Sequence, residues 1–185
     1  MFTEAIIGNY LDISDDKRAL TLSFALPAIE VMNFWSRCGL IANFGSSYMA
    51  VACPSQKNIA NSLSFILNEL LENAVKYARP KESILEFALL KQGDFITIDI
   101  TNPVFAEQVP PLIEMAKHLI DVDYVNGAYI DLLTMSGKAS DKSGIGLLTI
   151  INYYQASLSF RIGAAARNNH QQMYCIQAKI NIEEL

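Results

Sequence analysis

The chain has 185 residues, of which 51% are hydrophobic and 18% are charged. This length fits one globular domain with a substantial core, and the apolar content excludes a disordered chain. Fourteen basic against nineteen acidic residues give a net charge of −5, which excludes the global positive field of a nucleic-acid-binding protein.

The N-terminal third of the chain is predicted to contain one strand and two helices. Residues 19–26 have the pattern of a strand. A first helix is expected over residues 27–38, with Gly39 as its C-terminal stop. A second helix is expected over residues 41–53, because Pro54 cannot continue it.

The longest periodic segment, residues 57–78, predicts an amphipathic helix that ends at Arg79-Pro80. Its apolar residues share one broad face at helical spacing. Its polar residues form a narrow stripe on the other side, made up of Glu69, Glu72, Asn73 and Lys76. Glu72 and Lys76 are spaced as an i, i+4 salt pair, and a phosphate contact by Lys76 is the alternative.

The remaining elements come as two pairs of strands separated by an irregular stretch and a helix. In chain order we expect strands over 83–91 and 94–101, an irregular stretch over 102–142 with a helical piece near 112–120, a glycine turn and helix over 144–154, and strands over 156–163 and 172–182. Paired strands with grouped helices predict an α+β fold. We expect a two-layer α/β sandwich with a mixed β-sheet covered by helices on one face.

Residues 1–185 are predicted to form a single domain, because no linker, repeat or charge block interrupts them. Residues 57–185 carry the functional motifs. The first 55 residues either add an edge strand and helices to the sheet or build a homodimer interface. No apolar run reaches the length of about 18 residues that spans a membrane, and Glu4 stands where a signal peptide has basic residues. We expect a cytoplasmic protein without membrane or nucleic-acid partners.

Two motifs carry chemistry that suits a nucleotide. Glu69 and Asn73 lie one helical turn apart, so their side chains point the same way. An amide oxygen is a suitable ligand for Mg²⁺, and the neighbouring carboxylate suits a general base. Gly144 and Gly146 precede a helix, where backbone N–H groups approach a polyphosphate closely and the helix N-terminus favours its charge.

In this order, the two motifs resemble the N box and the second glycine box of the GHKL superfamily, the ATP-binding fold shared by DNA gyrase and histidine kinases. NELLENAVKYA (68–78) is similar to the N box, and SGIGLLTI (143–150) is similar to the segment that caps the triphosphate. The resemblance implies the Bergerat fold of that superfamily, with ATP and Mg²⁺ as cofactors. It also implies that Asn73 ligates the metal and that Glu69 is the catalytic carboxylate. The phosphate-binding residues it implies are Lys76, Lys142, Ser143, Gly144, Ile145, Gly146 and Leu147.

The chain departs from the superfamily at the first glycine box, D-x-G-x-G, which should follow ITIDIT. The strand there runs into Asn102-Pro103, so Asn102 is the residue expected to accept a hydrogen bond from the adenine amino group. Asp99 is a poor substitute, because it alternates with Ile98 and Ile100 inside the strand.

The positions of the histidines indicate which members of the superfamily the chain is most similar to. His118 and His170 both follow the N box, so the chain has no acceptor histidine on a preceding dimerisation helix. The chain is similar to the stand-alone anti-sigma-factor serine kinases and, most of all, to the SiaB-like protein kinases. The resemblance implies an ATP-dependent Ser/Thr protein kinase of bacterial partner-switching signalling. Its expected substrate is a small anti-sigma-antagonist-like protein (STAS or SiaC-like).

Two other functions stay open at this point. One is a non-catalytic binding module that sequesters a regulatory protein with weak or no nucleotide binding, which the absent first glycine box favours. The other is ATP hydrolysis that drives a conformational cycle, which the length of the chain disfavours, because the large GHKL ATPases that work in this way carry an additional transducer domain. SGKAS at 136–140 is no Walker motif, since no strand precedes it, and Gly144-x-Gly146 is no Rossmann fingerprint, since Thr149 replaces the third glycine.

Several other residues are expected to have structural roles. The cysteines, Cys38, Cys53 and Cys175, form no C-x-x-C pair and are interpreted as buried apolar fillers. His118 and His170 lack neighbouring ligands at metal spacing and are expected to be incidental. An aromatic cluster is assigned to core packing rather than to partner docking; it consists of Phe34, Trp35, Phe44 and Tyr48.

Overall fold

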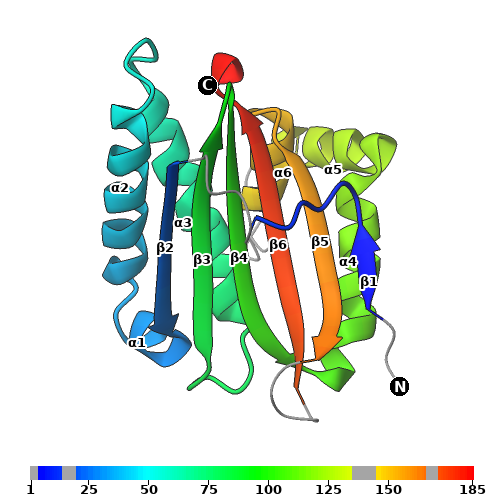
Figure 1. Ribbon diagram of the computed structural model, residues 1–185. Coiled ribbons are helices and arrows are strands. Elements are labelled where there is room, and N and C mark those ends of the chain that lie inside the picture. Colours follow the sequence, from blue (N-terminus) through cyan, green and yellow to red (C-terminus); the bar gives the residue numbers. More distant parts are fainter. Residues whose placement is uncertain (1–3, 14–19, 135–144, 166–170) are drawn as a thin grey trace.

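Alternating apolar residues build a six-stranded sheet with the order β1-β5-β6-β4-β3-β2 (Figure 1). The computed structural model describes residues 4–13, 20–134, 145–165 and 171–185. The strands are β1 (Ala5–Ile7), β2 (Leu20–Pro27), β3 (Ile84–Gln92), β4 (Phe95–Phe105), β5 (Ser157–Ala165) and β6 (Gln171–Asn181). All strands predicted from the sequence are present; the short β1 was not predicted, because three residues are too few to show an alternation.

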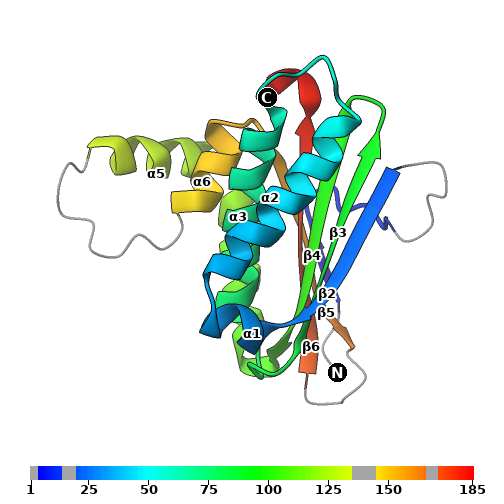
Figure 2. The ribbon, with the colours of Figure 1, turned by 90° about the vertical axis from the view of Figure 1, so that its left-hand side faces the viewer.

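The helices form a second layer on one face of this sheet (Figure 2). They are α1 (Ala28–Asn33), α2 (Ser36–Val51), α3 (Ile59–Tyr77), α4 (Val109–Ile120), α5 (Val122–Thr134) and α6 (Ile145–Asn152). Two short 3₁₀ turns, η1 (Ala106–Gln108) and η2 (Ile182–Glu184), follow β4 and β6. The predicted two-layer α/β sandwich is therefore confirmed, and the first 55 residues add strands and helices to it.

The sheet differs from the prediction in strand direction. Each of the five strand pairings among the described residues is antiparallel, so the expectation of a mixed sheet was wrong. The β3–β4 and β5–β6 pairs are hairpins, and β4 meets β6 in opposite direction at the centre of the sheet. Strand direction across that centre depends on how two distant hairpins dock, which a local pattern does not encode.

The helices of the N-terminal third begin and end elsewhere than predicted. The helical conformation is interrupted at Phe34 and Trp35, between α1 and α2. Gly39 lies inside α2. Gly39 lacks the positive φ of a helix-ending glycine, and a Cβ added there would meet nothing within 4 Å. The prediction that Gly39 ends the first helix was therefore wrong. A helix-ending glycine adopts a left-handed backbone conformation, and Gly39 does not.

The segment after residue 101 is far more regular than expected. β4 continues through Asn102 and Pro103, and the described part up to residue 134 then forms η1, α4 and α5. Pro103 is tolerated because β3 pairs with β4 only as far as Thr101. Pro110 and Pro111 occupy the first turn of α4, where a missing N–H costs nothing. The helical piece predicted near 112–120 is confirmed by α4. The expectation that the rest of 102–134 is irregular was wrong, and residues 135–142 lie outside the described part.

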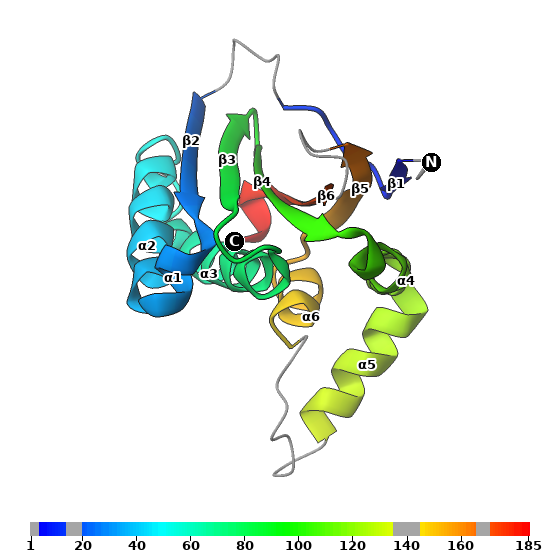
Figure 3. The same ribbon diagram turned by 90° about the horizontal axis from the view of Figure 1, so that it is seen from below.

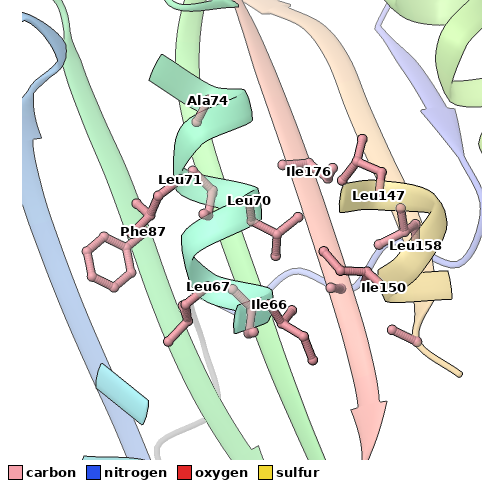
Figure 4. Close-up of a cluster of buried hydrophobic side chains, with 14 of the residues drawn as sticks. Ile66, Leu67, Leu70, Leu71, Ala74, Phe87, Leu147, Ile150, Leu158 and Ile176 are labelled. Carbon is pink, nitrogen blue, oxygen red and sulfur yellow. The ribbon is translucent and has the colours of Figure 1, made fainter. Parts of the chain in front are cut away.

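α3 forms the centre of the core and lies across the middle of the sheet (Figure 4). Its apolar face is completely buried, as the 3.6-residue pattern predicted, and consists of Ile59, Leu63, Ile66, Leu67, Leu70, Leu71, Ala74 and Val75. Leu147 and Ile150 of α6 pack beside it over β5 and β6. The polar stripe of α3 is thereby held in one orientation, with α6 next to it.

The three cysteines are buried and free, as predicted. The aromatic cluster is different: Phe34, Trp35, Phe44 and Tyr48 are all exposed, so their assignment to the core was wrong. They lie on α2 and the turn before it, on a surface that no described element covers. Within the described ranges, no helix is both long enough and apolar enough to cross a membrane.

The opposite face of the sheet holds a buried polar network around Asp99. The Tyr10 hydroxyl donates to Asp99 Oδ2 at 2.6 Å, and Gln177 Nε2 donates to the same oxygen at 3.0 Å. Gln177 also exchanges hydrogen bonds with the backbone of Leu11. Burial raises the pKa of the Asp99 carboxyl, although the hydrogen bonds from Tyr10, Gln177 and Thr101 act to lower it. This network holds residues 10–11 across the sheet.

We expect Asp99→Ala to lower the free energy of unfolding by about 1–3 kcal/mol, because Tyr10 and Gln177 lose their shared acceptor. Urea unfolding of the purified protein measures this loss. Glu86→Ala, at an exposed position on the same face, should change stability by less than about 0.5 kcal/mol. Equal stability of the two variants would contradict a structural role for Asp99.

Candidate functional site

The candidate site is built on the polar stripe of α3. Glu69 and Asn73 are partly buried, and Lys76 is exposed near the C-terminal end of the helix. The Asn73 amide nitrogen donates to the Glu69 carbonyl oxygen at 2.7 Å. This bond turns the amide nitrogen back toward the helix, so the acceptor Oδ1 is the end that a cation would use.

The first turn of α6 meets Glu69. A Cβ added to Gly146 would overlap the Glu69 carboxylate and would lie 3.0 Å from its Cγ. Gly146 is therefore required because the carboxylate takes the space of a side chain. This contact joins the two motifs, which are far apart in the sequence, at the N-terminal end of α6, where the helix dipole favours negative charge.

Glu69 has an unusual electrostatic environment. Burial raises the pKa of the Glu69 carboxyl, and the negative charge of Glu72 raises it further. Glu72 itself accepts a hydrogen bond from Asn68 Nδ2 at 2.6 Å. A half-buried carboxyl with a raised pKa is a better proton acceptor than an ordinary surface glutamate once it is ionised.

Asn102 lies on the helix-facing side of β4 and is fully buried, with 0% exposed. It shares this side with Ile98 and Ile100, because alternate residues of a strand face the same way. Its Nδ2 donates to the Pro103 carbonyl at 3.3 Å. Its Oδ1 is buried and has no hydrogen-bond partner among the described residues. An orphaned buried acceptor is costly, and a donor on a ligand would satisfy it.

Asp99 faces the other way, into the polar network of the uncovered face. Asp99 is a poor adenine acceptor by its sequence, because it alternates with Ile98 and Ile100 along the strand. The structure confirms that Asp99 and the helix layer lie on opposite sides of the sheet.

Asn102 is held beside the C-terminal end of α3 by a set of hydrogen bonds that the sequence did not reveal. Arg79 N donates to Pro103 O at 2.9 Å, and Gln108 Nε2 donates to Tyr77 O at 3.1 Å. The Gln108 side chain also accepts from Phe105 N at 2.9 Å. Gln108 thus ties the end of α3 to the end of β4, a role that only the fold makes visible.

The other predicted site residues fall into two groups. Ile145 and Leu147 open α6, but the Leu147 side chain is buried in the core (Figure 4), so only its backbone is available to a ligand. Lys76 Nζ lies 5.7 Å from the Tyr77 ring centroid. The predicted phosphate contacts Lys142, Ser143 and Gly144 lie outside the described residues, as do the 136–140 stretch and His170.

His118 is exposed and stacks on Tyr124, with ring centroids 4.5 Å apart. In the part of the chain that the structure describes, no group of three or more His, Cys, Asp or Glu side chains is placed to hold a metal ion. A cation at Asn73 would therefore complete its coordination with water and with oxygens of a ligand, as Mg²⁺ commonly does.

The sequence matches no protein-family model, and a search of curated proteins finds no match.

Proposed function

We propose that this chain is a GHKL-type, ATP-dependent Ser/Thr protein kinase. The observation that carries the proposal is the contact between Glu69 and Gly146, because it brings a carboxylate, an amide ligand one turn away and a glycine-led helix N-terminus together. A carboxylate, a hard oxygen ligand and an anion-binding helix end are the groups that phosphoryl transfer requires.

The residues present fit a Mg²⁺-nucleotide. Asn73 Oδ1 would hold the metal, and the first turn of α6 would hold phosphate oxygens through its backbone N–H groups. Asn102 Oδ1, the orphaned acceptor, would take a hydrogen bond from the amino group of adenine. When bound, Mg²⁺-ATP supplies the phosphoryl group and neutralises its charge.

Glu69 would accept the proton of the attacking hydroxyl and hold that oxygen in line with the phosphoryl group. The expected acceptor is a Ser or Thr on a small anti-sigma-antagonist-like protein of the STAS or SiaC-like kind. This choice of partner rests on the resemblance of the N box and the second glycine box alone.

The proposal is tested by isothermal titration of the purified protein with a non-hydrolysable ATP analogue, with and without Mg²⁺. Magnesium-dependent binding supports the site, and transfer from radiolabelled ATP to STAS-domain proteins then tests the kinase activity. No binding at millimolar nucleotide would overturn the proposal in favour of the non-catalytic binding module.

The pH dependence of turnover gives a second test. Burial and the charge of Glu72 raise the pKa of Glu69. As the pH falls, Glu69 therefore becomes protonated, and inactive as a base, at a higher pH than an ordinary glutamate does. Glu72→Gln removes the like charge and should shift the acidic limb of the kcat profile to lower pH. Turnover of Mg²⁺-ATP with water as acceptor measures this profile.

The matched control is Glu86→Gln, which removes a carboxylate from the uncovered face of the sheet. Its acidic limb should coincide with that of the unmodified protein. A Glu72→Gln profile that does not move would argue against Glu69 as the base.

A further inference from the structure

Asn102 is a neutral amide, and its two ends have opposite hydrogen-bonding character. The oxygen accepts hydrogen bonds, the nitrogen donates them, and the two atoms have nearly the same size. If the oxygen faces a purine base, it accepts from the 6-amino group of adenine. If the nitrogen faces the base, it donates to the 6-oxo group of guanine or hypoxanthine. The base that such a residue selects therefore depends on which way its amide is turned.

The carbonyl oxygen of Pro103 sets the direction of this amide. Asn102 Nδ2 donates to Pro103 O at 3.3 Å, which leaves Oδ1 as the end without a partner among the described residues. The reverse orientation would place two acceptors against each other, and because Asn102 is fully buried no bulk water would compensate. A bond of 3.3 Å is long, however, so it holds the amide only while the Pro103 carbonyl keeps its position.

The segment after α3 holds the Pro103 carbonyl. Arg79 N donates to Pro103 O at 2.9 Å, so this oxygen receives one N–H group from the backbone and one from the Asn102 side chain. A carbonyl oxygen has two lone pairs, and both are then used. The direction of the Asn102 amide thus depends on how the end of β4 lies against the end of α3.

Gln108 fixes that arrangement. Its Nε2 donates to the carbonyl oxygen of Tyr77, the last residue of α3, at 3.1 Å. Its Oε1 accepts from the N–H of Phe105, the last residue of β4, at 2.9 Å. α3 and β4 both end on the side of the sandwich that Figure 3 views, where β4 leads toward α4. One half-buried side chain therefore clamps the two elements together, two residues beyond the Pro103 carbonyl on β4.

We propose that Gln108 is a positioning residue that fixes the direction of the Asn102 amide and so makes the site select 6-amino purines over 6-oxo purines. The inference rests on the proposed function, because it requires that the base of a nucleotide reaches Asn102. Without Gln108 the end of β4 moves relative to α3, the long bond to Pro103 O is lost, and the amide turns to suit either base. A carboxylate at position 102 would need no clamp, because both of its oxygens are acceptors.

Isothermal titration with non-hydrolysable analogues of ATP and of inosine triphosphate, each with Mg²⁺, tests the proposal. Hypoxanthine has an oxo group where adenine has its amino group, so the ratio of the two dissociation constants reports the direction of the amide. The unmodified chain should bind the ATP analogue at least about 10-fold more tightly, because the inosine analogue leaves Oδ1 facing another acceptor.

Gln108→Met keeps the length of the side chain and removes both hydrogen bonds. It should lower the preference for the ATP analogue to less than about 3-fold, because the freed amide can donate to the inosine analogue. Gln108→Glu keeps the acceptor for Phe105 N and loses the donor to Tyr77 O, so it should lower the preference in the same direction. A purely structural role of Gln108 would weaken the binding of both analogues by the same factor and leave their ratio unchanged.

The rescue variant combines Gln108→Met with Asn102→Asp. The aspartate presents only acceptors, so the preference for the ATP analogue should return although the clamp is absent. The matched control is Gln56→Met, a partly buried glutamine before the opposite end of α3, which should keep the ratio of the unmodified chain.

The outcomes separate this inference from the proposed function. An unmodified chain that binds both analogues equally, an unchanged ratio in Gln108→Met, or a double variant that discriminates no better than Gln108→Met would overturn this inference alone. Absence of binding of either analogue to the unmodified chain would overturn it together with the proposed function.

Discussion

Gly146→Ala is expected to reduce phosphoryl transfer at least about 100-fold while the fold persists. The added methyl group would overlap the Glu69 carboxylate, which is the movable end of a side chain and must swing away. A misplaced base cannot receive the proton of the acceptor hydroxyl, and a carboxylate pushed toward the phosphates repels them. The stability cost should be about 1–3 kcal/mol, typical of an overpacked site.

Two further variants separate this mechanism from general damage to the protein. Gly39→Ala, inside α2 where a Cβ would meet nothing within 4 Å, should keep full transfer and gain up to about 1 kcal/mol of stability. Gly146→Ala combined with Glu69→Ala removes the overlap, so nucleotide binding should recover in titration while transfer stays lost. Transfer at the unmodified rate in Gly146→Ala would refute the assigned role of this contact.

Asn73→Ala is expected to abolish phosphoryl transfer, a loss of on the order of 1,000-fold or more. Asn73 is the only protein ligand that we assign to the metal, and its amide nitrogen donates to the Glu69 carbonyl oxygen of the same helix. The apolar face of α3 is unchanged by the substitution, so the thermal unfolding midpoint should fall little. Titration should show that magnesium no longer strengthens nucleotide binding.

Asn61→Ala provides the matched control, because Asn61 is an exposed asparagine on the same helix, away from the stripe of Glu69 and Asn73. It should bind nucleotide with the magnesium dependence of the unmodified protein. Undiminished transfer by Asn73→Ala would exclude Asn73 as the metal ligand and with it the mechanism proposed for Glu69.

Local periodicity by itself predicted the strongly patterned elements. The apolar face of α3 and the alternation of Ile96, Ile98 and Ile100 in β4 each identify one buried face. The same alternation placed Asp99 on the other side of its strand. The motifs of Glu69, Asn73 and Gly146 were visible because their chemistry depends on spacing within a single helix or turn.

The tertiary structure decided what depends on neighbours distant in the chain. Only docking of α6 beside α3 sets Gly146 against Glu69, and only the meeting of α3, β4 and η1 gives Gln108 its place beside Asn102. α2 carries apolar side chains both on its buried side and on its exposed side, so composition alone misassigned Phe44 and Tyr48 to the core. A side chain is buried only if another element covers it, and that is a property of the assembled layers rather than of the residue.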